Sequence, residues 1–245
     1  MPAPLMRSAG LDGCRAGWVC IGWDGRKWAA TVFASLAQSL AYVASGARVC
    51  IDMPVGLSET GLRACDQEAR QLLGPRRSSV FAAPPSFAMQ EMSYAELNSE
   101  SKRRYGRGVS KQAFYLLPKI RETARHLHDH RDRCQDWREV HPELCFAALQ
   151  DGVPVSENKK TQAGYRQRMA ILRARLGART VTRLIDKLDA HPLRAGVARD
   201  DILDAMVCGY VARLDGSELR ALPAGDVERN ERGDAMQIWF PSAQV

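Results

Sequence analysis

The chain has 245 residues, of which 45% are hydrophobic and 26% are charged, so it can bury the core of one large domain or two small ones. No apolar run is long enough to cross a membrane, and no signal-peptide pattern begins the chain, so we expect a cytoplasmic protein. The seven cysteines are scattered and include no C-x-x-C pair, so we expect no structural zinc site. The net charge of +7 fits either an ordinary surface or contact with nucleic-acid phosphates.

Four strands and a helix are predicted in the first part of the chain. The apolar residues before Asp12 predict the first strand, and residues 17–23 and 28–33, separated by a DG turn, predict the second and third. The segment SLAQSLAYVAS predicts a helix with Ser35 as its cap. RVCI is the strongest signal for a buried strand and leads directly into Asp52. This order indicates an α/β sheet with an antiparallel edge.

The following region is predicted to be mostly helical. SETGLRACDQEARQLLG begins with a capping signature and predicts a helix that ends at Gly74. KQAFYLLPKIRETARHLHDH predicts another helix, kinked or started afresh at Pro118. Residues 140–146 then predict a strand or strand edge. We expect a helical insertion over about 58–137 because this region lies between two strands of the predicted sheet.

Two amphipathic helices are predicted over residues 161–176 and 179–190, and MQIWFP predicts a short terminal strand. No internal repeat or low-complexity linker separates these elements. The chain is therefore predicted to form one domain, residues 1–245, that includes the helical insertion.

The segment VARDDILDAM places three aspartates at the start of an apolar helix. Capping explains two of them, with Asp200 as the N-cap and Asp201 complementing the helix dipole. Asp204 lies one turn further, among apolar residues, and helical spacing places it on the same face as Asp201. Two carboxylates on one face repel each other unless a cation lies between them.

Carboxylates also follow other apolar runs, where an unpaired charge is costly. The acidic residues at such positions are Asp12, Asp52, Glu143, Asp201 and Asp204. In an open α/β sheet, sites form where strand ends converge, and oxygen-rich sites suit Mg²⁺ or Mn²⁺. Two such ions about 3.5–4 Å apart clamp the attacking and leaving oxygens of a phosphodiester. The sequence thus predicts a metal site that performs phosphodiester chemistry.

The motifs GLDGCRAGW, IDMPVG, RRSSVFAAPP, HPELCF and DDILDA occur in the order seen in the DUF429 family, predicted nucleases with an RNase H-like fold. The chain resembles this family over nearly its whole length. The resemblance implies a five-stranded mixed sheet, three antiparallel strands and then two parallel ones, flanked by helices. It also implies that Asp12, Asp52 and Asp204 are metal ligands, with Asp201 as a companion to Asp204, and it places Glu143 in the HPE motif.

Basic residues in two segments are candidates for contacts with substrate phosphates. These are Arg76 and Arg77 in GPRRSS and Lys159 and Lys160 in ENKKTQ, and a solvated surface is the alternative explanation. The leading hypothesis is a metal-dependent nuclease acting on DNA or RNA. The alternatives are a non-catalytic module that binds nucleic acid or protein, and a nucleotide phosphotransferase, against which the absence of phosphate-cradling loops weighs.

Other residues are weaker candidates. The histidines of RHLHDHRD have the wrong spacing for a metal motif, and an interaction with the helix dipole explains them better. His141 is expected to be structural rather than an acid–base group. The three tryptophans of the first strands are expected in the core rather than stacked on bases.

Overall fold

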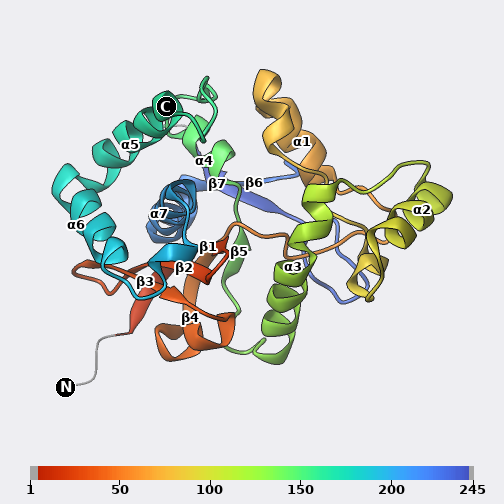
Figure 1. The fold of residues 1–245 in the computed structure, drawn as a ribbon, viewed down its shortest axis with the longest axis horizontal. Helices are drawn as coiled ribbons and strands as arrows, with labels where there is room; N and C mark the ends of the chain where they lie inside the picture. Colours follow the sequence, from red (N-terminus) through yellow and green to blue (C-terminus); the bar gives the residue numbers. More distant parts are fainter. Residues whose placement is uncertain (1–4, 243–245) are drawn as a thin grey trace.

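The computed structural model describes residues 5–242, and its main sheet has five strands in the spatial order β3-β2-β1-β4-β5. They are β1 (Met6–Cys14), β2 (Gly17–Trp23), β3 (Trp28–Phe33), β4 (Val43–Ile51) and β5 (Trp137–Glu139). β1, β2 and β3 are antiparallel neighbours, whereas β4 pairs parallel with β1 and β5 pairs parallel with β4 (Figure 1). The predicted α/β fold, with three antiparallel strands followed by two parallel ones, is confirmed.

The described residues also form helices and a short hairpin. The α-helices are α1 (Ala64–Leu72), α2 (Tyr94–Tyr105), α3 (Lys111–Asp129), α4 (Pro142–Ala148), α5 (Gln162–Leu176), α6 (Ala178–Asp189) and α7 (Arg199–Arg213). The 3₁₀ helices are η1 (Leu36–Ala41), η2 (Gly74–Ser79), η3 (Ser86–Met89), η4 (Arg194–Gly196) and η5 (Gly216–Glu218). β6 (Leu219–Leu222) and β7 (Ile238–Pro241) form an antiparallel hairpin. Among the helices of residues 5–242, none combines the length and apolarity that crossing a membrane requires.

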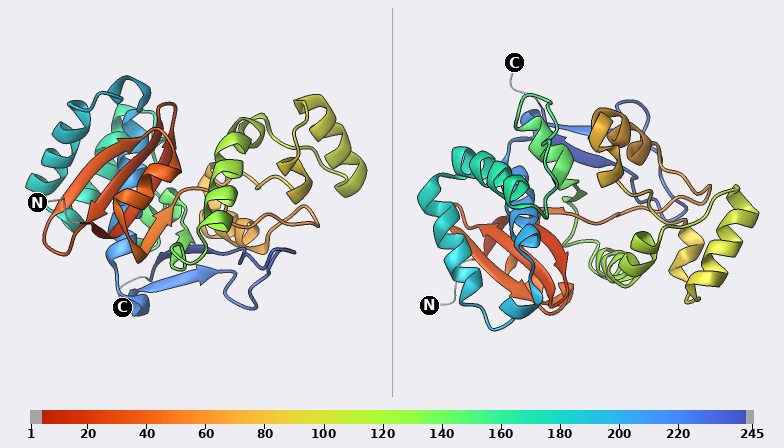
Figure 2. Two further views of the ribbon diagram at one scale, coloured as in Figure 1. Left: turned by 90° about the horizontal axis from the view of Figure 1, so that it is seen from below. Right: turned by 45° about the horizontal axis from the view of Figure 1, so that its top comes forward.

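α7 covers one face of the main sheet, and η1 and α3 contribute to the cover of the other, so most residues of the central strands β1 and β2 are buried. α7 packs on β1, β2 and β4, with α5 and α6 beside it (Figure 1). On the other face, Ile120 of α3 meets Leu11 and Ile51 in a second apolar cluster. Residues 52–136, between β4 and β5, contain α1, α2 and α3, and α2 lies far from the sheet (Figure 2).

Glycines allow α7 to lie directly on β1. A Cβ added to Gly10 would overlap the backbone of Cys208 and Gly209, and one added to Gly209 would lie 2.9 Å from the Ile21 carbonyl oxygen. Any larger side chain at Gly10 would therefore push α7 away from the sheet. The close contact determines how near the aspartates of α7 come to β1.

The helix predicted from Ser35 is wrong in type and length. η1 has six residues, Ser35 provides no side-chain cap, and β4 already begins at Val43. Val43 and Val49 are β-branched, which favours strands, and both pair with residues of β1. Pairing with the sheet therefore outweighs the local helical pattern.

The strand predicted over residues 140–146 is also wrong, because this segment is mainly helical. β5 ends at Glu139, and Pro142 occupies the first turn of α4, where the fixed φ of proline favours a helix. All residues of α4 are buried. A short apolar run of this kind fits a buried helix as well as a buried strand, so periodicity alone does not distinguish them.

Two details of the helical region differ from expectation. The helix predicted from Ser58 begins only at Ala64, because the Ser58 hydroxyl hydrogen-bonds within a turn to Thr60. α3 continues through Pro118 as one helix and does not start afresh there.

Candidate active site

Two carboxylates lie next to each other on neighbouring parallel strands. Leu11 of β1 is in register with Ile51 of β4, and the backbone N–H of Asp52 donates a 2.9 Å hydrogen bond to the Leu11 carbonyl. Asp12 follows Leu11 and Asp52 follows Ile51, so the two aspartates lie side by side on neighbouring strands, which are about 4.8 Å apart. Because side chains alternate between faces, both carboxylates project from the face that α7 covers, opposite to Leu11 and Ile51.

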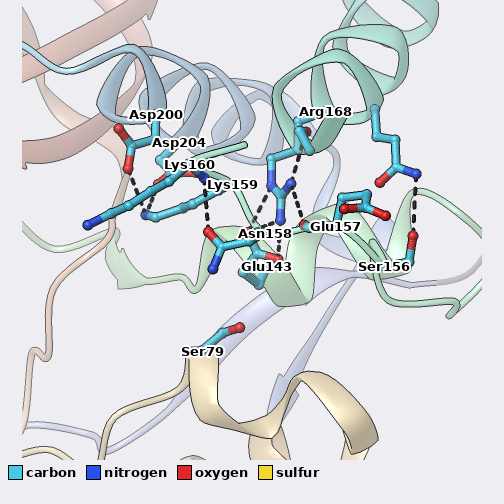
Figure 3. Close-up of polar contacts among 12 residues, drawn as sticks. Ser79, Glu143, Ser156, Glu157, Asn158, Lys159, Lys160, Arg168, Asp200 and Asp204 are labelled. Carbon is cyan, nitrogen blue, oxygen red and sulfur yellow. Dashed lines mark hydrogen bonds and ion pairs between the residues drawn. The ribbon is translucent and has the colours of Figure 1, made fainter. Parts of the chain in front are cut away.

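α7 adds the carboxylate of Asp204, which is only 1% exposed. Its Oδ2 accepts a 2.6 Å hydrogen bond from Lys159 Nζ, which also lies 3.8 Å from Asp200 Oδ2 (Figure 3). The other oxygen, Oδ1, is buried and has no hydrogen-bond partner within residues 5–242. The cation beside Asp204 is therefore a lysine that the sequence analysis assigned to phosphate contacts.

The remaining aspartates of α7 have different environments. The N-cap residue is Ala198, so the prediction of Asp200 as N-cap is wrong. Asp201 accepts a 2.8 Å hydrogen bond from the backbone N–H of Ala198 and closes the first turn. A capping hydrogen bond thus accounts for Asp201 at the start of the helix, whereas the charge of Asp204 is balanced by Lys159.

The carboxylates raise one another's pKa values. Burial, followed by the charges of Asp52 and Asp204, raises the pKa of Asp12 well above its usual value. Burial and the charge of Asp204 raise the pKa of Asp52 to about 8. Burial disfavours the Lys159 ammonium, but Asp204, Asp52 and Asp12 outweigh it and raise the pKa of Lys159 above its usual value. A cation bound between these carboxyl groups would therefore relieve their mutual repulsion and favour their charged forms.

A cavity of about 680 Å³ brings most of the predicted residues together. Its lining includes all five predicted carboxylates, Asp12, Asp52, Glu143, Asp201 and Asp204. It also includes basic and polar side chains, among them Arg76, Ser78, Ser79, His141, Lys159 and Lys160. Arg77 does not line this cavity. It is exposed on η2, beside Arg70 and Gln71, so the structure separates it from the other predicted phosphate contacts.

Glu143 is already paired with a buried arginine. The Arg168 guanidinium donates to both carboxylate oxygens of Glu143, with Nη2 at 2.7 Å from each and Nε at 2.9 Å from Oε1 (Figure 3). Both side chains are buried. The charge of Glu143 is thus balanced within the protein, and its carboxylate joins α4 to α5 rather than standing free in the cavity.

A second buried ion cluster lines the same cavity, and sequence reasoning missed it. Arg63, only 2% exposed, pairs with Asp66 of α1 and Glu139 of β5. Asp66 and Glu139 also accept hydrogen bonds from the backbone N–H groups of Ala83 and Val55. The cluster fixes the segments that follow β4 and precede α2. Only the spacing of Arg63 and Asp66 is visible in the sequence, because Glu139 lies far away in the chain.

The histidines and tryptophans that were weaker candidates for functional roles make packing and hydrogen-bond contacts within the fold. His141 Nε2 lies 3.3 Å from the Ser79 carbonyl oxygen and so links the start of α4 to η2, and burial lowers the His141 pKa below its usual value. Trp18 and Trp28 are buried in the core. His126 is buried on α3 against the rings of His130 and Trp137.

The donor set fits a divalent ion that also uses ligands from outside the protein. Within residues 5–242, no three His, Cys, Asp or Glu side chains are already arranged around one position. Asp12 and Asp52 nevertheless provide two neighbouring carboxylates, and Asp204 Oδ1, which has no partner among the described residues, adds a third donor. Mg²⁺ is commonly held by one or two carboxylates together with waters and substrate phosphates. The residues present therefore suit a metal that binds with its substrate.

Comparison with known proteins identifies the family to which the chain belongs. The chain matches the family described as "Protein of unknown function (DUF429)" over residues 10–228. No curated protein matches the chain, and no solved structure matches it either. Because the match spans most of its length, the chain belongs to the DUF429 family.

Proposed function

We propose that this protein is a divalent-metal-dependent nuclease that hydrolyses phosphodiester bonds of DNA or RNA in the cavity beside Asp12 and Asp52. The observation that carries the proposal is the matched position of these two carboxylates on parallel strands, with Asp204 and basic side chains lining the same cavity. Carboxylates that raise one another's pKa favour a bound cation, and oxygen ligands suit Mg²⁺ or Mn²⁺. Seven free cysteines support a cytoplasmic location.

Each group has a role in this proposal. Asp12 and Asp52 would hold the ion, and Asp204 in the same cavity would provide a further carboxylate ligand. Bound Mg²⁺ or Mn²⁺ would supply positive charge that stabilises the phosphodiester as it reacts. Arg76 and Lys160 hold phosphate oxygens, and Arg76 Nε is a buried donor without a partner in the described part of the chain.

Hydrolysis adds one water molecule across the ester bond. The water oxygen forms a bond to phosphorus and gives up a proton, the bond from phosphorus to the ester oxygen breaks, and that oxygen takes up a proton. The carboxylates accept hydrogen bonds from the water and orient it, while Arg76 and Lys160 orient the phosphate and balance its charge.

One observation favours a second candidate, a non-catalytic module that binds nucleic acid or protein. Lys159 already pairs with Asp204, and Arg168 already pairs with Glu143, so the charges of two predicted carboxylates are balanced without a metal. A binding module would keep the basic lining of the cavity and take up no divalent ion.

The test combines metal binding with cleavage. Purified protein is titrated with Mn²⁺ in a calorimeter, and labelled single-stranded DNA, duplex DNA, RNA and a branched junction are incubated with and without Mn²⁺. We expect Mn²⁺ binding and Mn²⁺-dependent cleavage in wild type and the loss of both in Asp12→Asn and Asp52→Asn. Asp186→Asn, an exposed aspartate of α6, is the matched control and should behave as wild type.

The outcomes separate the two candidates. Binding of nucleic acid without Mn²⁺ uptake and without cleavage of any substrate would support the binding module instead of the nuclease. Cleavage that survives both Asp12→Asn and Asp52→Asn would show that the reaction takes place elsewhere.

A further inference from the structure

Lys159 extends from a tightly closed turn before α5. The Asn158 carbonyl accepts hydrogen bonds from the backbone N–H of Thr161 at 2.9 Å and from its hydroxyl at 2.8 Å. The Asn158 side chain accepts a 3.0 Å hydrogen bond from the backbone N–H of Lys160. Thr161 Oγ1 in turn caps α5 by accepting a 3.0 Å hydrogen bond from the Gly164 N–H. The backbone of Lys159 is therefore held on both sides.

The Glu143–Arg168 pair anchors this turn to the rest of the molecule. Besides its bonds to Glu143, Arg168 donates from Nη1 to the carbonyls of Gly164 at 2.9 Å and Glu157 at 3.2 Å (Figure 3). A Cβ on Gly164 would overlap the Asn158 carbonyl, so the turn packs directly on α5. Glu143 thus acts on the cavity through Arg168, by holding the turn from which Lys159 extends.

The two side chains of the Lys159–Asp204 ion pair differ in how much they are exposed and how freely they can move. The Asp204 side chain is 2% exposed and fixed on α7, whereas the Lys159 side chain is 37% exposed and lines the cavity. A lysine side chain has a flexible stem, so its ammonium is free to turn toward a new anion while its backbone stays in place. If it leaves, both oxygens of Asp204 lack a partner, because Oδ1 already has none within residues 5–242.

We propose that Lys159 exchanges Asp204 for a phosphate of the nucleic acid and thereby frees Asp204 to bind the divalent ion. This inference rests on the proposed function. In the protein without substrate, the Lys159 ammonium balances Asp204 and competes with the metal for it. A phosphodiester that enters the cavity offers the ammonium another anion, so the metal gains a third carboxylate only when substrate is present.

The exchange makes metal and nucleic acid bind cooperatively. By linkage, a nucleic acid that raises the affinity for metal has its own affinity raised by the metal by the same factor. Lys160 lines the same cavity from the same turn but forms no ion pair with Asp204, so it provides a matched comparison.

The experiment measures the Mn²⁺ affinity of the full chain by calorimetry, with and without saturating phosphorothioate single-stranded DNA, which is resistant to cleavage. We expect the DNA to raise the Mn²⁺ affinity of wild type by about 5- to 150-fold, the usual range of coupling between sites. Lys159→Met should bind Mn²⁺ more tightly than wild type without DNA and should lose most of the DNA effect. Lys160→Met removes the same charge and weakens the contact with phosphate, but at saturating DNA it should retain the coupling, because Lys160 does not pair with Asp204.

Further variants guard against a general loss of structure. Lys159→Arg keeps the cation and should keep the coupling, whereas Asp204→Asn should lose the coupling because no carboxylate is released. Equal Mn²⁺ affinities of wild type and Lys159→Met, with the same DNA effect, would overturn the exchange and leave the nuclease proposal standing. No Mn²⁺ binding by any variant, with or without DNA, would overturn both.

Discussion

At the scale of single residues, Glu143 and Arg168 form a buried ion pair whose partners depend on each other. Glu143→Gln removes the charge and keeps the shape, so it leaves the buried Arg168 guanidinium without a counter-ion. Breaking one side of such a pair typically costs about 3–5 kcal/mol of unfolding free energy. We expect a loss of this size in urea denaturation, with Asp186→Asn unchanged. A stable Glu143→Gln that fails to bind Mn²⁺ would instead make Glu143 a metal ligand.

His126 provides a pH-dependent term in stability. It is 6% exposed, and burial, followed by the neighbouring His130, lowers the His126 pKa from 6.5 to about 4. Between these values the unfolded chain binds a proton that the folded protein does not, so stability present above pH 6.5 is lost as the pH falls toward 4. His126→Phe should remove a slope of up to about 1.4 kcal/mol per pH unit, as measured by denaturation across this range.

The control for this effect lies on the same helix. His128 is exposed, so His128→Gln should keep the wild-type pH dependence. An unchanged slope in His126→Phe would assign the acid sensitivity to groups other than His126.

Asp12 and Asp52 were predictable because each adjoins a buried apolar strand, and parallel register brings such positions together. Lys159 and Arg168 were not predictable in their roles. Their partners, Asp204 and Glu143, lie 45 and 25 residues away in the chain, and local periodicity does not encode which distant charge a flexible side chain meets.

At the scale of elements, the contact between α7 and β1 determines where Asp204 lies. Gly10→Ala places a methyl group within the backbone of α7, and overpacking of this kind costs about 1–3 kcal/mol. We expect lower stability and weaker Mn²⁺ binding, since Asp204 moves away from Asp12. Gly13→Ala is the matched control on the same strand, because its Cβ would make only ordinary contacts from 3.5 Å outward. Equal stability of the two variants would refute the close-packing argument.

The predicted helices and strands are accurate where the local sequence pattern of a segment is compatible with only one secondary structure. The strands predicted at residues 17–23 and 28–33 have the predicted bounds, because a tight turn and a continuous apolar pattern act together. The segment after Ser35 and the segment at 140–146 carry patterns compatible with two structures. In both segments, long-range packing determines the secondary structure. The first segment pairs with β1, and every side chain of α4 in the second segment is buried.

At the scale of the whole molecule, the cavity is built by segments from distant parts of the chain. β1 and α7 supply carboxylates, whereas η2, inserted between β4 and β5, supplies Arg76 and Ser79, and the turn before α5 supplies Lys160. Acidic and basic groups therefore share one cavity, as a site for a metal ion and a phosphate requires. The sequence indicated the charged clusters but not which arginine of η2 lines the cavity.

That difference between neighbouring arginines gives the prediction for the molecule as a whole. Arg76 lines the cavity and has a buried Nε donor without a partner in residues 5–242, whereas Arg77 is exposed outside it. If Arg76 and Lys160 each neutralise one phosphate, replacing both with alanine should reduce the slope of log affinity against log salt by about 2 units, because two fewer counterions are released on binding. Fluorescence anisotropy of labelled single-stranded DNA over a range of salt concentrations measures this slope. Arg77→Ala paired with Lys160→Ala removes the same total charge and should reduce the slope by only about 1 unit. An equal reduction in the two double variants would mean that the nucleic acid responds to the net charge of the surface and does not enter the cavity.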